Sequence, residues 1–285
     1  MVVVGASTLS VYDNVAYSQK LQNCATGWIL VMNGPARILA VLQLYETAGP
    51  VLTVDDIARS LNLSASTAYR SVRSLVQAGF LDPVAGAGYA LGPAFIRYDR
   101  LLRQGDRLSR IAEPVMRDLV AGAGGRGTVI LCRRFRDCVM CVHEVRGDAP
   151  YAETTYERGV AMPMFVGASS KAIMAFLPDR QLKAVYLANE AVIRASGPAT
   201  WPEFKAQLRE IRRRGYALTD SEVARGRIGL AAPVFLDDQV IAGLSLVVTT
   251  SVMTRPAVEA LVPTLVDAAR AVTDGVSRDA DAVPR

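Results

Sequence analysis

The stretch "LNLSASTAYRSVRSLVQAGFL", residues Leu61 to Leu81, decides the fold class of the first part of this chain. Its apolar side chains recur at helical spacing and form one stripe: Ala68, Val72, Leu75 and Val76. The opposite stripe holds Ser66, Tyr69, Arg70, Arg73 and Gln77, and no acidic residue occurs in the stretch. A helix with one buried face therefore exposes a surface that lacks carboxylates.

Two shorter helices are expected before this one. Apolar residues at helical spacing after Pro35 predict a first helix that stops by Gly49-Pro50. Thr53 followed by Asp56 resembles a capping box, which marks the start of a second helix. The third helix then follows after a tight turn.

The bounds of the third helix and the sequence after it complete a known motif. Ser64 is suited to cap the helix, and Gly79 is expected to end it. A glycine-rich turn at residues 84–88 between two short apolar runs predicts a β-hairpin. Three short helices followed by a hairpin form a winged helix-turn-helix, whose third helix enters the DNA major groove.

DNA binding explains the acid-free helix face. A surface that approaches phosphates and base edges benefits from small hydroxyl groups, from arginines that fork onto guanine, and from the absence of carboxylates. The alternative is an ordinary solvated helix that lacks acids by chance. The preceding helices and the hairpin favour the DNA-binding interpretation.

Two helices are expected to link this domain to the rest of the chain, over residues 93–104 and 106–121. The second contains Pro114, which predicts a kink. It also carries a full apolar stripe: Leu108, Ile111, Ala112, Val115, Met116, Leu119 and Val120. The stripe fits a core face and a dimer seam equally well.

From Gly127 onward the pattern changes to strands with inserted helices. We expect strands at residues 128–132, 138–145, 150–156, 230–236 and 240–249. Helices are expected at residues 168–177, 180–188, 200–214 and 256–273. This order predicts an α+β fold with an antiparallel-sheet sensor domain. The expected parts are an irregular N-terminal extension (1–34), the winged helix-turn-helix (35–92), linker helices (93–124), an effector-binding domain (125–274) and a frayed tail (275–285).

Composition sets the broad class of protein. A length of 285 residues predicts two domains, and 51% apolar residues exclude disorder as the overall state. The net charge of +5 permits a polyanionic partner without requiring one. The N-terminal sequence lacks a signal-peptide pattern, and no apolar run reaches the roughly 18 to 20 residues of a membrane helix. We therefore expect a cytoplasmic protein without membrane contact, whose four cysteines form no structural disulfides.

Other chemical signals are weaker. Cys138 and Cys141 with His143 suggest zinc, but two strand residues three apart point to opposite faces. His143 is the only histidine, and we expect it to be structural. Residues 168–171 fall one short of a Ser-x-x-Lys signature, and no phosphate loop, dinucleotide fingerprint or histidine triad occurs. We therefore expect no metal, no cofactor and no catalytic site.

The chain resembles the isocitrate lyase regulator (IclR) family of bacterial transcription factors over residues 35–273. The resemblance depends on the order of five stretches: "LTVDDIARSLNLSASTAYRSVRSLVQAGFL" (52–81), "GYALGP" (88–93), "GVAMPMFVGASSKAIMAFLP" (159–178), "IRRRGYALTDSE" (211–222) and "GLAAPVF" (229–235). It implies a ligand-responsive regulator of a metabolic operon, repressor or activator. Its partners would be double-stranded operator DNA, a small-molecule effector bound by a GAF-like domain, and further copies in a homodimer or dimer of dimers.

The resemblance also implies which residues face DNA: Thr53, Ser64, Ser66, Thr67, Tyr69, Arg70, Arg73, Gly86 and Gly88. The family often has Pro-Lys where this chain has Ser64-Ala65. This departure removes one phosphate contact.

Eleven positions correspond to the family's effector pocket: Met162, Met164, Phe165, Val166, Gly167, Ala168, Thr219, Asp220, Gly229, Ser245 and Val247. The family tends to have Arg and Leu-His where this chain has Ala161 and Met164-Phe165. Thr219, Gly229 and Val247 likewise replace more polar residues. These differences predict a larger, apolar or aromatic ligand rather than a small keto acid, and the backbone amides before Lys171 would still hold a carboxylate.

A second function remains open at this stage. The chain could be a small-molecule-binding or hydrolytic sensor whose N-terminal module mediates protein contacts.

Overall fold

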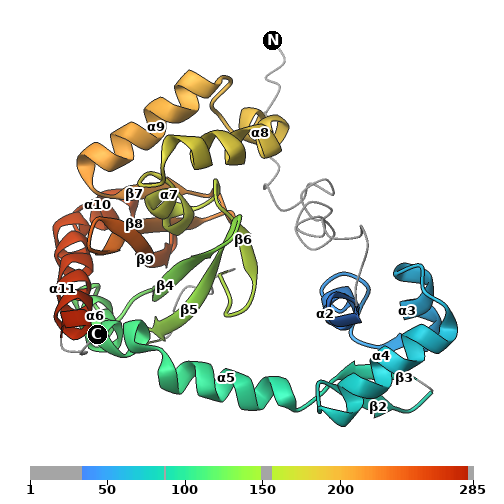
Figure 1. Cartoon of the computed structure of the whole chain (residues 1–285). Coiled ribbons are helices and arrows are strands. Elements are labelled where there is room, and N and C mark those ends of the chain that lie inside the picture. Colours follow the sequence, from blue (N-terminus) through green and yellow to red (C-terminus); the bar gives the residue numbers. More distant parts are fainter. Residues whose placement is uncertain (1–33, 87, 149–155, 282–285) are drawn as a thin grey trace. The chain divides into compact units, whose positions relative to one another are not determined.

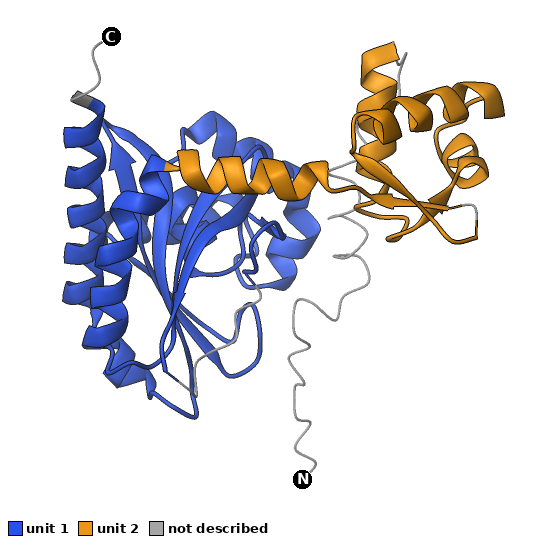
Figure 2. Ribbon diagram, turned by 90° about the horizontal axis from the view of Figure 1, so that it is seen from below, with its two compact units in different colours: residues 1–17, 107–285 blue, residues 18–106 orange. Residues whose placement is uncertain are grey.

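The computed structural model describes residues 34–86, 88–148 and 156–281 (Figure 1). Two compact units divide after Asp106, and Figure 2 colours them separately. The expected pair of linker helices is thus not a separate part, because its first helix belongs to one unit and its second to the other. No helix within the described ranges is long and apolar enough to cross a bilayer.

The N-terminal unit is a winged helix-turn-helix, as predicted. Its described elements are α2 (Gly34–Leu44), β1 (Leu52–Thr53), α3 (Val54–Ser60), α4 (Ala65–Gln77), β2 (Leu81–Val84), β3 (Gly88–Leu91) and α5 (Ala94–Gly105). The three strands pair antiparallel in the order β1-β3-β2. The two-residue strand β1 was not expected, because so short a segment has no periodicity of its own.

One face of each helix fills the core of this unit. Its buried members include Val41 of α2, Ile57 of α3, and the predicted α4 residues Ala68, Val72 and Leu75. The hydroxyl of Tyr45 donates a hydrogen bond to the carbonyl of Tyr89 (2.9 Å), and burial raises the pKa of Tyr45 to about 12. This bond joins the chain after α2 to the wing strand β3.

The two ends of α4 are formed in different ways. Gly79 adopts φ +76°, and the amides of Gly79 and Phe80 donate to the carbonyls of Val76 and Leu75. These bonds form a Schellman C-cap, as glycine at this position predicts. At the other end Ser64 occupies the N-cap position, but its hydroxyl makes no capping bond to a backbone amide. The expected Ser64 side-chain cap is therefore wrong.

The predicted capping box of α3 is confirmed. The Thr53 hydroxyl accepts from the Asp56 amide (3.1 Å), and the Asp56 carboxylate accepts from the Thr53 amide (3.1 Å) and hydroxyl (2.6 Å). Hydrogen bonds from Thr53 hold the pKa of the Asp56 carboxyl below its ordinary value of 3.8. The charged form of Asp56 therefore stabilises the start of α3.

The second unit contains a six-stranded antiparallel sheet in the order β6-β5-β4-β9-β8-β7. Its described strands are β4 (Thr128–Phe135), β5 (Cys138–Arg146), β6 (Ala161–Pro163), β7 (Ala217–Asp220), β8 (Arg227–Leu236) and β9 (Gln239–Thr249). Its described helices are α6 (Arg107–Gly122), α7 (Ala168–Met174), α8 (Asp179–Ala195), α9 (Trp201–Arg214), α10 (Arg255–Glu259) and α11 (Val262–Asp281). This confirms the α+β class. The short strands β6 and β7 were not predicted, and most of the strand expected at 150–156 lies outside the described residues.

Side chains of the sheet alternate between two different environments. On one face, Leu230 of β8 and Leu246 of β9 pack in a core with α6 and α11, and Figure 1 shows these two helices side by side. The other face contacts α7. The core includes the predicted α6 stripe, which is buried or partly buried along its length. This stripe is therefore a core face of its own unit, and α6 continues through Pro114 without a break.

The C-terminal end differs from the expected frayed tail. One predicted helix is instead two, α10 and α11, and Gly275 lies inside α11. A β-carbon at Gly275 would lie 2.6 Å from the Ile111 side chain of α6. This glycine allows two helices to approach closely rather than ending one.

We predict that Thr53→Ala lowers the free energy of unfolding by about 1 kcal/mol at neutral pH, because the α3 cap is lost. The lowered pKa of Asp56 means that the cap contributes above pH 3.8 and is lost as pH falls through the folded-state value. The difference from wild type should therefore shrink in strong acid. Urea unfolding at several pH values measures it.

Thr47→Ala is the matched control, since Thr47 bonds only weakly to the Leu44 carbonyl (3.5 Å) and caps no helix. Equal destabilisation by the two substitutions would contradict the capping role.

Candidate functional site

The exposed face of α4 carries the residues predicted to face DNA. Ser66, Arg70 and Arg73 are exposed, and the Tyr69 side chain is 52% exposed. Helix α4 contains no acidic residue. Neither Arg70 nor Arg73 forms an ion pair within the described part of the chain, whereas Arg59, Arg103 and several other arginines do. Two unneutralised guanidinium groups thus lie on one surface, as binding to phosphates or base edges requires.

A short chain of hydroxyl contacts arranges the start of this face. The Ser64 hydroxyl lies 2.8 Å from the Thr67 hydroxyl, to which Arg70 also donates at 3.4 Å. Ser66 lies 3.3 Å from Ser64 through their hydroxyl oxygens. Ser64 therefore positions other polar side chains, since its contacts replace the expected backbone cap.

Two residues predicted to face DNA have other roles. The Thr53 hydroxyl donates its proton to Asp56 in the α3 capping box, so it has no proton left for a phosphate. Gly88 is buried in β3, where an added β-carbon would lie 2.5 Å from the Val51 side chain. Gly88 therefore serves packing rather than DNA approach. Gly86, by contrast, is exposed in the wing turn with φ +90°.

A cavity open to solvent lies between α7 and the sheet. Thr219, Gly229 and Val247 are cross-strand neighbours on β7, β8 and β9, and Ser245 lies opposite Ile130. These side chains alternate with those of the core, which places them on the opposite face. The complete lining is Ile130, Tyr156, Ala168, Ser169, Thr219, Glu222, Val223, Arg227, Gly229, Ser245 and Val247.

Five of the residues predicted to bind effector line this cavity: Ala168, Thr219, Gly229, Ser245 and Val247. Six do not, namely Met162, Met164, Phe165, Val166, Gly167 and Asp220. The four apolar side chains among these six are buried, and Asp220 points to solvent. Gly167 directly precedes Ala168 of the lining, and its backbone amide donates to Glu222, which also lines the cavity. Effector contacts by these six residues stay a prediction, and the structure places the four apolar side chains in the core.

Sequence reasoning missed six lining residues: Ile130, Tyr156, Ser169, Glu222, Val223 and Arg227. The Ser169 hydroxyl is buried and interacts with the Cys132 thiol. Arg227 is the first residue of β8, and the alternation of that strand could have indicated that it shares a face with Gly229. Nothing in the sequence would have marked Tyr156.

The start of α7 is already occupied by a carboxylate of the chain itself. Glu222 accepts a hydrogen bond from the Gly167 amide (3.2 Å) and forms an ion pair with Lys171 (2.5 Å). Glu222 therefore occupies the Gly167 amide, one of the amides expected to hold a ligand carboxylate. The partnership also places Lys171 in an ion pair rather than in an acyl-transfer site.

Gly167 is required by the architecture beside the cavity. It adopts φ +80°, and a β-carbon there would lie 2.5 Å from the Tyr156 hydroxyl and 2.8 Å from Val223. The Tyr156 hydroxyl donates to the Val166 carbonyl (2.7 Å) and lies 3.0 Å from the Ser170 hydroxyl. Tyr156 thus closes one wall against the backbone before α7. Gly229 makes space in the opposite wall, since a β-carbon there would lie 3.1 Å from the Thr219 hydroxyl.

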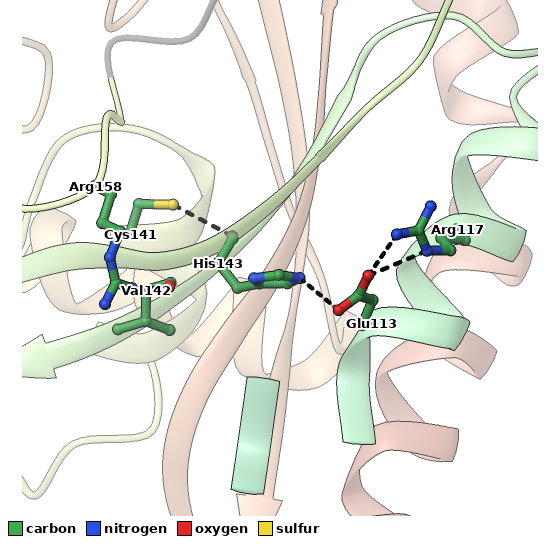
Figure 3. Close-up of polar contacts among 6 residues, drawn as sticks. All are labelled: Glu113, Arg117, Cys141, Val142, His143 and Arg158. Carbon is green, nitrogen blue, oxygen red and sulfur yellow. Dashed lines mark hydrogen bonds and ion pairs between the residues drawn. The ribbon is translucent and has the colours of Figure 1, made fainter. Parts of the chain in front are cut away.

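His143 does not line the cavity; it lies on β5 and contacts Glu113 of α6 (Figure 3). Its Nε2 is 3.5 Å from a carboxylate oxygen of Glu113, whose other oxygen accepts from Arg117. The hydrogen bond from Arg117, and also the charge of His143, lower the pKa of Glu113. These contacts support the structural role expected for His143.

The cysteines of the sheet are placed among packing side chains. Cys141 is buried and donates to the His143 carbonyl (3.3 Å), while Cys138 is half-buried on the same strand. Burial and the neighbouring Cys141 raise the pKa of the Cys132 thiol, which makes it a poor nucleophile. No three potential metal-ligand side chains come together in the ranges that the structure describes.

Comparison with known proteins agrees with this architecture. Residues 35–84 match the family described as "IclR helix-turn-helix domain", and residues 104–274 match "Bacterial transcriptional regulator IclR C-terminal". The regulator KipR of Bacillus subtilis is 28% identical over 221 residues, which are 73% of this chain and 82% of that protein. The glycerol operon regulatory protein of Streptomyces coelicolor is 31% identical over 249 residues, 85% and 94% of the two chains.

A solved structure supports the fold. An IclR homolog from Microbacterium hydrocarbonoxydans, complexed with 4-hydroxybenzoate, has a TM-score of 0.68 and 22% identity, and it covers 87% of this chain and 100% of its own. A winged helix-turn-helix joined to a small-molecule-binding domain defines a ligand-responsive DNA-binding transcriptional regulator. The chain belongs to the IclR family of bacterial transcriptional regulators.

We predict that Gly167→Ala destabilises the protein more than Gly159→Ala. Both glycines have positive φ, which costs an alanine about 1–2 kcal/mol. Only Gly167 adds a steric clash, expected to cost a further 1–3 kcal/mol or so. Gly159 has no atom within 4 Å of an added β-carbon, so it is the matched control. Urea unfolding measures both, and equal losses would contradict the close contact with Tyr156.

Proposed function

We propose that this protein binds operator DNA as a homodimer through α4 and the Gly86 wing, and that an effector in the cavity sets its affinity. The single observation that carries the proposal is the exposed face of α4. It combines small hydroxyls with two arginines that form no ion pair with any described residue, on a helix without carboxylates in a winged helix-turn-helix. The residues that we assign to DNA are Ser64, Ser66, Thr67, Tyr69, Arg70, Arg73 and Gly86.

The proposed effector is an apolar or aromatic molecule. Ile130, Tyr156 and Val247 give the cavity apolar walls, as sites for apolar and aromatic small molecules have. The relative crystallised with 4-hydroxybenzoate supports an aromatic ligand. Binding would act by differential affinity for two arrangements of the DNA-binding units.

The proposed dimer uses exposed apolar side chains of α5. Ile96, Leu101 and Leu102 are 76%, 55% and 66% exposed, which is unusual for three large apolar residues within one helix. Helix-turn-helix proteins read two half-sites as dimers, so a second copy is the proposed occupant. We propose that the protein acts in the cytoplasm, where operator DNA is found, and without catalytic turnover.

We predict that Arg70→Ala weakens specific operator binding by about 1–3 kcal/mol. The loss follows from removing a guanidinium group that faces bases or phosphates. Fluorescence anisotropy on a duplex from the protein's own upstream intergenic region measures it, beside a shuffled duplex and at two salt concentrations.

Arg194→Ala is the matched control. Arg194 is an exposed arginine of α8, and its removal changes the net charge equally. Binding that is equal on both duplexes, or equally reduced by both substitutions, would show only nonspecific electrostatics. That result would favour a sensor whose N-terminal module mediates protein contacts.

We predict that Leu102→Asp converts the dimer to a monomer and lowers operator affinity at the same protein concentration. In the proposed dimer, the aspartate carboxylate would be buried at the α5 interface without a partner for its charge. Size-exclusion chromatography with light scattering measures the mass. Leu187→Asp, at a 59% exposed leucine of α8, should leave the mass unchanged. A dimeric Leu102→Asp protein would contradict this interface.

A further inference from the structure

We infer that Arg227 binds the carboxylate of an aromatic monocarboxylate effector, while Glu222 keeps the neighbouring cation and backbone amide closed to it. This inference deepens the proposed function and rests on the cavity being the effector site. It names the chemical class of the effector and the residue that selects it. It also separates two positions at which an anion could bind.

The first position, at the start of α7, is filled. One carboxylate oxygen of Glu222 pairs with the Lys171 ammonium (2.5 Å), and the other accepts from the Gly167 amide (3.2 Å). Both side chains of the pair are mostly shielded, with 22% and 33% of their surfaces exposed. A ligand carboxylate that took this position would have to break both contacts and leave Glu222 without its partners.

The second position, at Arg227, is open. Arg227 lines the same cavity and forms no ion pair with any described residue. Its backbone is fixed, because its amide donates to the Ala224 carbonyl (3.2 Å) and its carbonyl accepts from the Ser221 amide (2.8 Å). Ser221 and Gly226 have positive φ and form a tight turn that presents Arg227 at the start of β8.

The charges of the lining residues select the charge of the ligand. Glu222 and Arg227 are the charged residues of the described lining, and Lys171 neutralises Glu222. One positive charge therefore remains, and a guanidinium group binds a single carboxylate in a forked geometry. A ligand with two carboxylates would leave one of them unpaired.

The rest of the lining describes the body of the ligand. Ile130, Val223 and Val247 provide apolar surface, and the Tyr156 ring lies in the same wall. An aromatic ring that bears one carboxylate combines this apolar surface with the charge of Arg227.

The test compares an acid with its uncharged amide. 4-Hydroxybenzoate and 4-hydroxybenzamide are titrated by calorimetry into the full-length wild type, Arg227→Gln, Arg227→Lys, Glu222→Gln and Arg225→Gln. Benzoate and phenylacetate are added as further acids. Arg225 is the matched control, since it is an exposed arginine in the same turn and does not line the cavity. Thermal unfolding of each variant verifies folding.

We expect the wild type to bind the acid at least tenfold more tightly than the amide. Arg227→Gln should reduce this ratio to about one, and Arg227→Lys should retain part of it because the charge remains without the fork. Arg225→Gln and Glu222→Gln should keep the preference for the acid. An acid preference that persists in Arg227→Lys would show that the loss in Arg227→Gln comes from the missing charge and not from a disturbed structure.

Two results would overturn the inference. Unchanged acid preference in Arg227→Gln would show that Arg227 does not bind the carboxylate. Binding of none of the three acids by the wild type would show that Arg227 is not a carboxylate site. Operator binding measured on the same samples decides separately whether the regulator assignment stands.

Discussion

Every helix and strand of this protein must bury one face, and this constraint leaves the opposite face for function. In α4 the buried face holds Ala68, Val72 and Leu75, which fixes the helix so that its arginines point outward. In β8 the core takes Leu230, and the cavity takes Gly229. Side chains repeat every 3.6 residues in a helix and every two residues in a strand, and these periods determine which residues face DNA on α4 and the cavity on β8.

Charge pairing affects how available a charged surface is for binding. Many arginines of the chain pair within a helical turn, as Arg213 does with Glu210 and Arg255 with Glu259. Such exposed pairs contribute little to stability, but they neutralise the charge. Arg70, Arg73 and Arg227 lack this neutralisation within the described residues, and each belongs to one of the two proposed sites.

The two linker helices show how the units are built. α5 belongs to the winged-helix unit and keeps large apolar side chains at its surface, while α6 is buried against the sheet and α11. The strand β4 contacts α6 through Leu131 on one face and lines the cavity through Ile130 on the other. The cavity and α6, the helix that follows α5 in the sequence, therefore lie on opposite faces of β4.

The sequence by itself determined the elements that carry their own periodicity and end signals. The α4 stripe, the glycine that ends α4, the α3 capping box and four of the sheet strands were predicted from neighbouring residues, because local hydrogen bonds and one buried face define them. The order of the motifs also indicated the family and the positions of half the cavity wall.

Only the tertiary structure decided which residues share a site across the sheet. β1, β6 and β7 are too short to show a period, and they form because longer strands pair with them. Tyr156, Ser169 and Arg227 meet in one cavity although they come from three distant segments. The Glu222 pair with Lys171 spans 51 positions, and the Gly275 contact with Ile111 is longer still. No local pattern encodes such contacts, since they exist only after long-range packing brings the segments together.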